Sequence, residues 1–143
     1  MPIEIVEADT EDLRQLAFAL RHAIFVVEQG VPEALERDGL DASAYHAIAI
    51  DDGRCIATGR FVRQANGVAR LGRMAVHASW RRRGLGGRVL DALEARARAE
   101  GFREAQLHAQ SYVEDFYLRR GYARMGDVFE EAGIDHVAMR KAL

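Results

Sequence analysis

The sequence predicts one mixed α/β domain built on a mostly antiparallel sheet. Strand-like and helix-like segments alternate along the 143 residues, two hairpin turn signals lie near the middle of the chain, and no linker or repeat interrupts the pattern. A chain of this length can bury roughly two-thirds of its unfolded surface in one core. We therefore treat residues 1–143 as a single domain.

The first half of the chain predicts a strand, two helices and a three-stranded meander. Apolar and polar side chains alternate over 2–7, and Asp9 or Thr10 can cap a helix whose apolar residues continue at helical spacing to Val27. A short helix is expected over 33–37. The meander strands are expected over 45–50, 55–63 and 68–76, with turns at Asp52-Gly53 and Asn66-Gly67.

The second half predicts a long helix, then a strand, a helix and two further strands. The long helix covers 84–101, with Gly101 as its C-terminal cap. A strand follows over 105–109, and a helix over 113–120 ends at Gly121. The last strands are expected over 122–125 and 136–139. The predicted order is therefore β-α-α-β-β-β-α-β-α-β-β.

Composition argues against several classes of protein. The net charge is only -2, so the chain as a whole is not a polyanion binder, and no aromatic residues interleave with its arginine cluster as nucleic-acid binding would favour. Cys55 is the only cysteine, which excludes an intrachain disulfide and a cysteine-based zinc site. We expect Cys55 to be a buried, inert thiol, and no metal. Because no long apolar run or signal pattern occurs, we expect a cytoplasmic protein without membrane contact.

The most informative segment is the loop that leads into the long helix, Arg81-Arg82-Arg83-Gly84-Leu85-Gly86-Gly87, followed by Arg88. Backbone N–H groups at a helix start are unpaired, and the helix dipole places partial positive charge there. Glycines leave these N–H groups uncovered, and the arginines add full charges. The loop therefore predicts a pyrophosphate site. The alternative is an arginine-rich helix start on a solvated surface.

Two common nucleotide-binding loops do not fit this segment. A P-loop needs a lysine and a hydroxyl residue after its glycines, and neither is present here. A Rossmann loop opens a parallel βα unit, whereas this loop follows an antiparallel meander. The pattern Arg81-x-x-Gly84-x-Gly86 instead resembles the acyl-CoA loop of the GNAT superfamily, (Q/R)-x-x-G-x-(G/A).

Further motifs extend the resemblance over nearly the whole chain. The segment from Phe116 to Tyr122 resembles the superfamily signature F-Y-x-x-x-G-F/Y, and Gln110 stands seven residues before Tyr117, where many members carry Asn. The chain also resembles the ElaA-like branch of the superfamily, in residues 20–32, Glu36, Asp38, Asp41, His46, 107–110 and 129–139. Asp135 departs from the branch, which has proline in its G-I-P-H motif. This departure puts the local backbone and an acceptor contact in doubt.

The resemblance implies a GNAT-like three-layer fold, with helices on both faces of a mixed, mostly antiparallel sheet, and acetyl-CoA as the acyl-donor co-substrate. The sheet is expected to splay between strands 68–76 and 105–109, with Gly72 either marking a bulge or serving as an ordinary strand glycine. Trp80 is expected to cap the loop by packing, or to stack near the adenine. The expected acyl-CoA contacts are Met74, Ala75, Val76, Arg81, Arg82, Arg83, Gly84, Leu85, Gly86, Gly87, Arg88, Gln110, Val113, Phe116 and Tyr117.

The resemblance also implies an N-acyltransferase in which an amine attacks the thioester directly. Tyr117 would protonate the CoA sulfur, and the backbone amide near Val76 would stabilise the oxyanion. The candidate bases are Glu28, His46, His108 and His136, of which Glu28 and His136 are favoured. A water relay without a dedicated base stays open.

Other features leave alternatives open. Glu36, Asp38 and Asp41 would either attract a cationic amine or form a solvated acidic loop. A non-catalytic acyl-CoA-binding module and transfer of a longer acyl group both stay open. The acceptor is a small molecule, a peptide N-terminus or a lysine side chain. A homodimer is also open, because dimers are frequent among similar proteins.

Overall fold

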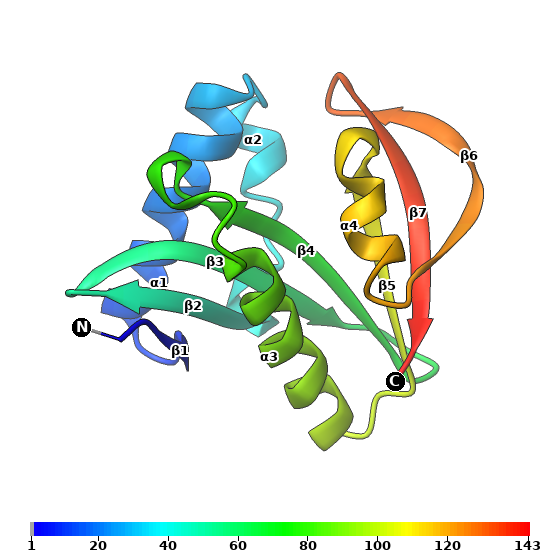
Figure 1. The fold of residues 1–143 in the computed structure, drawn as a ribbon, viewed down its shortest axis with the longest axis horizontal. Coiled ribbons are helices and arrows are strands. Elements are labelled where there is room, and N and C mark those ends of the chain that lie inside the picture. Colours follow the sequence, from blue (N-terminus) through cyan, green and yellow to red (C-terminus); the bar gives the residue numbers. More distant parts are fainter. Residues whose placement is uncertain (1) are drawn as a thin grey trace.

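The computed structural model describes residues 2–143, which form a seven-stranded sheet with helices on both faces (Figure 1). The strand order is β1-β2-β3-β4-β5-β7-β6, and within this sheet β4 and β5 are the one parallel pair. The predicted fold class and element order are confirmed. The strands are β1 (Glu4–Glu7), β2 (Tyr45–Asp51), β3 (Arg54–Arg63), β4 (Val68–Val76), β5 (Glu104–Gln110), β6 (Ala123–Glu131) and β7 (Ile134–Ala142).

The two faces of the sheet bury different side chains because neighbouring residues of a strand point in opposite directions. In β2, Ala47 and Ala49 pack in the main core with α3, whereas Ile48 between them packs against Ala17 of α1. Thr10 caps α1, since its side chain accepts a hydrogen bond from the Leu13 N–H at 3.2 Å. The helices are α1 (Glu11–Arg21), α2 (Glu33–Glu36), α3 (Leu85–Ala99) and α4 (Glu114–Leu118).

Some boundaries differ from those that the sequence predicts. The helix expected to continue to Val27 changes at His22–Glu28 into a π-helical segment, where the Gln29 N–H bonds the Ile24 carbonyl five residues earlier. The spacing of apolar residues cannot reveal that a backbone hydrogen bond here spans five residues instead of the usual four. The expected strand 122–125 extends in β6 to Glu131, because a register shift after Met125 interrupts the alternation on which the prediction relied. The helix expected over 113–120 is shorter, and a 3-10 turn at Ser111–Val113 precedes it.

The sheet opens between β4 and β5 as predicted (Figure 1). Their pairing ends at Leu71 and Leu107, although both strands continue. A bulge in β4 accompanies this opening. In the β3–β4 ladder Thr58 pairs with Ala75 and Arg60 with Gly72, so one β3 residue faces two of β4. The bulge therefore lies beside Gly72, and Arg73 carries its positive φ of 55°.

We expect Gly59→Ala, opposite the bulge, to lower the free energy of unfolding by about 1–3 kcal/mol through overpacking. A Cβ at Gly59 would collide with the Met74 sulfur and lie 3.0 Å from side-chain carbons of both Val89 and Leu93. Gly72→Ala is the matched control, because nothing lies within 4 Å of its Cβ position. Urea denaturation measures both variants, and equal midpoints would contradict the packing argument.

Candidate functional site

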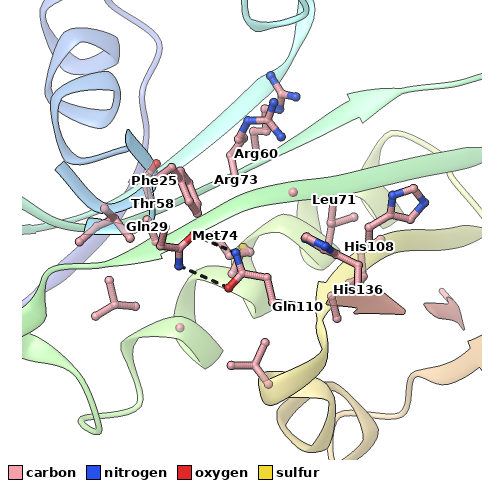
Figure 2. Close-up of a pocket in the computed structure, with 18 of the residues that line it drawn as sticks. Phe25, Gln29, Thr58, Arg60, Leu71, Arg73, Met74, His108, Gln110 and His136 are labelled. Atoms are coloured by element: carbon pink, nitrogen blue, oxygen red, sulfur yellow. Dashed lines mark hydrogen bonds between the residues drawn. The ribbon is translucent and has the colours of Figure 1, made fainter. Parts of the chain in front are cut away.

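A cavity of about 1060 Å³ runs between the diverging ends of β4 and β5 (Figure 2). Its wall also includes the start of α3, helix α4 and the π-helical segment. The cavity thus brings together residues that are far apart in the sequence. The predicted site residues on its wall are Glu28, Met74, Ala75, Val76, Arg81, Arg82, Gly84, Leu85, Gly86, Gly87, Gln110, Val113, Phe116, Tyr117 and His136.

The start of α3 presents uncovered backbone N–H groups to this cavity. Gly84 precedes the helix in the left-handed conformation, with φ of 77°, which only glycine adopts without strain. The first backbone bond of the helix runs from the Arg88 N–H to the Gly84 carbonyl at 3.1 Å. Among residues 2–143, the structure records no backbone acceptor for the N–H groups of Leu85, Gly86 and Gly87. This helix start can therefore bind an anion.

The arginines of the loop take different directions. Arg81 donates to the Val76 carbonyl at 3.1 Å and forms an ion pair with Glu28 at 2.8 Å, which ties the loop to the π-helical segment. Arg82 faces the cavity. The structure places Arg83 and Arg88, both predicted cofactor contacts, outside the cavity wall.

Local contacts explain why these two arginines lie outside the cavity. The Arg83 guanidinium lies 4.8 Å from the ring centre of Trp80, and Arg88 donates to the Ile3 carbonyl at 3.0 Å. Trp80 itself packs against the main core. These contacts support the packing role predicted for Trp80, which also lies on the cavity wall, so stacking near the adenine stays a prediction.

Tyr117 lies at the cavity wall with a neutral hydroxyl group. Its side chain is buried, and burial raises the pKa of the phenol above its ordinary value. Edge contacts with Phe116 and Tyr122, with ring centres 5.0 and 5.6 Å away, hold the ring in place. Within residues 2–143 the structure records no hydrogen bond for this hydroxyl. It is therefore free to donate a proton to a ligand atom in the cavity.

His136 has a defined tautomer. Its Nδ1 lies 2.7 Å from the Ile134 carbonyl, and because a carbonyl only accepts, Nδ1 carries the proton. In the neutral ring, Nε2 is then left with a lone pair, 3.8 Å from a Glu131 carboxylate oxygen. His136 can thus accept a proton at Nε2, and Glu131 can stabilise the resulting cation.

The other candidate bases lie in different surroundings. His46 is buried beyond the cavity, where its Nε2 lies 2.9 Å from the Asp41 carbonyl, and burial lowers its pKa. His108 faces the cavity. Cys55 is partly buried, and burial raises its pKa to about 12, as expected for an inert thiol.

Two glutamines join the opposite sides of the cavity (Figure 2). Gln29, at the end of the π-helical segment, and Gln110, at the end of β5, exchange hydrogen bonds of 2.9 and 3.3 Å. Gln110 is a predicted cofactor contact, and its amide keeps a second N–H and a second lone pair with which it can bind a ligand.

The acidic residues Glu36, Asp38 and Asp41 do not form the site that the sequence predicts. Each one is paired with arginines from other elements, so none is a free anion for a cationic amine, and of the three only Asp38 lies in an exposed loop. The ion pairs are Arg21–Glu36, Arg21–Asp41, Arg60–Asp38, Arg60–Asp41, Arg73–Glu36 and Arg73–Asp38. Three carboxylates and three guanidinium groups therefore cancel in formal charge and fasten the α2 loop to the sheet.

The arginines control the protonation of this network. Burial by itself would raise the pKa of Asp38, but hydrogen bonds and charge from Arg60, with further charge from Arg73, hold it well below its usual range. Burial and two arginines act on Asp41 in the same way, and its pKa is also lowered. Because the folded state binds these protons more weakly than the unfolded chain, both carboxylates stabilise the fold above about pH 4. That contribution is lost as the pH falls through the lowered pKa values.

We expect Asp38→Asn to lower the free energy of unfolding at pH 7 by roughly 1–3 kcal/mol, since it removes a charged acceptor from Arg60 and Arg73. The difference from the wild type should shrink below about pH 4, where Asp38 in the unfolded wild-type chain begins to take up a proton while the folded protein still holds it ionised. Asp52→Asn is the matched control in an exposed turn. Urea titrations at pH 7, 5 and 3 test this, and a constant difference across these pH values would contradict it.

Sequence reasoning missed Gln29 and Arg70 as cavity residues. For Arg70, the alternation of β4 was the available signal: Ala69 and Leu71 are buried in the core, so the residue between them points to the other face. No comparable local signal marked Gln29. Within residues 2–143, no His, Cys, Asp and Glu side chains group as metal ligands would. None of the helices in this range is long and apolar enough to span a bilayer.

Comparisons with known proteins agree with this geometry. Residues 8–143 match the family model described as the acetyltransferase (GNAT) domain. The uncharacterized N-acetyltransferase YjcF of Bacillus subtilis is 34% identical over 140 residues, which cover 97% of this chain and 99% of that protein. A crystal structure of an acyl-CoA N-acyltransferase from Pseudomonas aeruginosa is 31% identical, with a TM-score of 0.87 over 99% of this chain and 100% of that one.

Escherichia coli ElaA shares the fold, with a TM-score of 0.89 at 23% identity, over 98% of this chain and 99% of that one. This likeness is one of fold. The family match covers nearly all of the chain, and the cavity holds the predicted anion-binding helix start. The chain therefore belongs to the GNAT acetyltransferase family, whose domain carries out acyl-CoA-dependent acyl transfer.

Proposed function

We propose that this protein is an N-acetyltransferase that transfers acetyl from acetyl-CoA to an amine by direct attack on the thioester. One observation carries the proposal: a single cavity joins the unpaired N–H groups at the start of α3 to the opening between β4 and β5. A substrate with a diphosphate and an extended amide-bearing arm fits such a cavity. The same cavity continues to the His136 side of the sheet, from which an amine can approach.

The two ends of acetyl-CoA would use different features of the protein. The diphosphate would accept hydrogen bonds from the N–H groups of Leu85, Gly86 and Gly87, beside the charge of Arg82. The pantetheine arm would lie along Met74–Val76, where β4 continues beyond the end of its pairing with β5. Its amides can bond the backbone there as an added strand does.

The chemistry needs an oxyanion donor and a proton for the leaving thiolate. As the amine attacks the thioester carbon, the backbone N–H near Val76 would donate to the developing oxyanion. When the carbon–sulfur bond breaks, the Tyr117 hydroxyl would protonate the sulfur. The position of Tyr117 on the cavity wall supports this role, because its phenol is protonated at neutral pH and has no recorded protein acceptor within residues 2–143.

The amine must also lose a proton. His136 is the best-placed base, because its Nε2 can accept this proton and Glu131 lies near enough to stabilise the cation. The Glu28 carboxylate is already bound to Arg81, so we assign Glu28 to holding the loop in place. A water relay can connect the amine with His136 if the two do not meet directly.

Thermal unfolding with and without acetyl-CoA, followed by an amine screen that detects free CoA, tests the proposal. We expect acetyl-CoA to raise the melting temperature, because it binds the folded state alone, and at least one amine to release CoA. No thermal shift at millimolar acetyl-CoA would refute the assigned binding site. A thermal shift without CoA release from any amine would instead indicate a non-catalytic acyl-CoA-binding module.

A further inference from the structure

Three basic side chains, those of Arg70, His108 and His136, lie on one face of the sheet. They line the amine end of the cavity, the end from which the amine is proposed to approach. Arg70 pairs with Gln106 across β4 and β5, and Gln110 pairs with His136 across β5 and β7. Since paired residues share a face and alternate residues of a strand do too, Arg70, His108 and His136 point to the same side. Figure 2 shows both imidazoles on that side, and all three residues line the cavity.

Arg70 differs from most arginines of the cavity wall in having no carboxylate partner among the described residues 2–143. Of the five arginines on the wall, Arg60, Arg73 and Arg81 each form an ion pair. Within the described range 2–143, no carboxylate oxygen is recorded within 4.0 Å of Arg70 or of Arg82. Arg82 belongs to the loop at the diphosphate end. Arg70 is therefore the unneutralised cation at the amine end.

The neighbours of Arg70 do not satisfy its guanidinium. One terminal nitrogen lies 2.9 Å from His108 Nδ1, and the same Nδ1 lies 3.0 Å from a Glu131 carboxylate oxygen. Nδ1 can accept from Arg70 or donate to Glu131, but it cannot do both. The same terminal nitrogen also lies 3.4 Å from His108 Nε2, which can accept when Nδ1 donates, so in either tautomer four of the five guanidinium N–H groups lack a protein acceptor around a partly buried charge. Such a group binds a carboxylate well, because its planar fork can donate two parallel hydrogen bonds.

The position of Arg70 suits a carboxylate on the acceptor. Arg70 immediately precedes Leu71, the last residue of β4 paired with β5, so its side chain begins next to the point where the two strands start to diverge. We propose that the acceptor is an amino-acid-like compound whose carboxylate binds Arg70 while its amine enters this opening beside His136. This inference rests on the proposed acetyl transfer and specifies its substrate class.

The test compares free amino acids with their carboxamides as acceptors, in the wild type and in Arg70→Met, by CoA release. We expect kcat/KM in the wild type to favour the acid, and Arg70→Met to lower the acid-to-amide ratio about ten- to a hundredfold. Comparing the ratios of the two proteins cancels any difference in basicity between the two amines. Activity on the amide should survive in the variant, and Arg70→Lys should restore part of the preference.

Arg140→Met is the matched control. Arg140 lies on the same sheet face, opposite Gln106 in the β5–β7 ladder, but it is exposed and not on the cavity wall. It should leave the acid-to-amide ratio unchanged, and the acetyl-CoA thermal shift reports folding of each variant. An equal ratio in the wild type and Arg70→Met would overturn the inference while leaving acetyl transfer intact, as would a preference for peptide N-termini or protein lysines. An absence of CoA release with every amine would refute the proposed function itself.

Discussion

Gly86→Asp should weaken acetyl-CoA binding by at least roughly 100-fold. A Cβ at Gly86 makes ordinary contacts, the nearest at 3.7 Å from the Phe116 ring, so the side chain fits. Its carboxylate would occupy the anion site and repel the diphosphate. Two unit charges 4 Å apart repel by about 4 kcal/mol at an effective dielectric constant of 20. Solvent screening at the loop weakens this repulsion, and the remaining energy corresponds to a loss of roughly 100-fold in affinity. Calorimetric titration of acetyl-CoA measures the change.

The stability of the ligand-free variant separates this effect from misfolding. An acidic residue in the first turn of a helix is favourable by about 0.3–1 kcal/mol, so Gly86→Asp should not lower the melting temperature of the free protein. Ala95→Asp is the matched control, because it adds the same charge at an exposed position of the same helix. It should leave the affinity for acetyl-CoA unchanged. If Gly86→Asp bound acetyl-CoA as tightly as the wild type, the diphosphate would not lie at the start of α3.

Tyr117→Phe should lower kcat by about 100-fold or more, the usual effect of losing a general acid. The phenol is neutral, buried and without a recorded protein hydrogen bond within residues 2–143. Removing its oxygen therefore leaves no protein group unsatisfied. The affinity for acetyl-CoA should stay within about threefold, because less than 1 kcal/mol of binding is removed. Single-turnover measurements with a responsive amine separate this chemical step from binding.

Tyr122→Phe provides the control within the same aromatic cluster. The Tyr122 hydroxyl donates to Glu94 at 2.8 Å and lies away from the cavity wall, and burial raises its pKa. Because the acceptor is a buried carboxylate, its loss should cost about 1.5–3 kcal/mol of stability and leave kcat unchanged. If Tyr117→Phe turned over at the wild-type rate, or if both variants slowed equally, Tyr117 would not be the proton donor.

Local sequence patterns were sufficient to predict the order of elements and the unpaired N–H groups at the start of α3. Strand alternation, the turn pairs and the glycines depend on neighbouring residues, so the sequence displays them directly. The unpaired N–H groups of Leu85–Gly87 follow from a helix that begins after a left-handed glycine. The same local reasoning failed at His22–Glu28 and in β6, where a π-helical segment and a register shift break the ideal periods.

Charge pairing was decided by the tertiary structure alone. The sequence displays Glu36, Asp38 and Asp41 as an acidic segment, but Arg60 and Arg73 reach it from strands about 20 to 35 residues further along the chain. Electrostatic energy depends on distance in space, which composition and spacing do not contain. For the same reason only the folded sheet distinguishes Arg70, a cation without a carboxylate, from the arginines whose charges are neutralised.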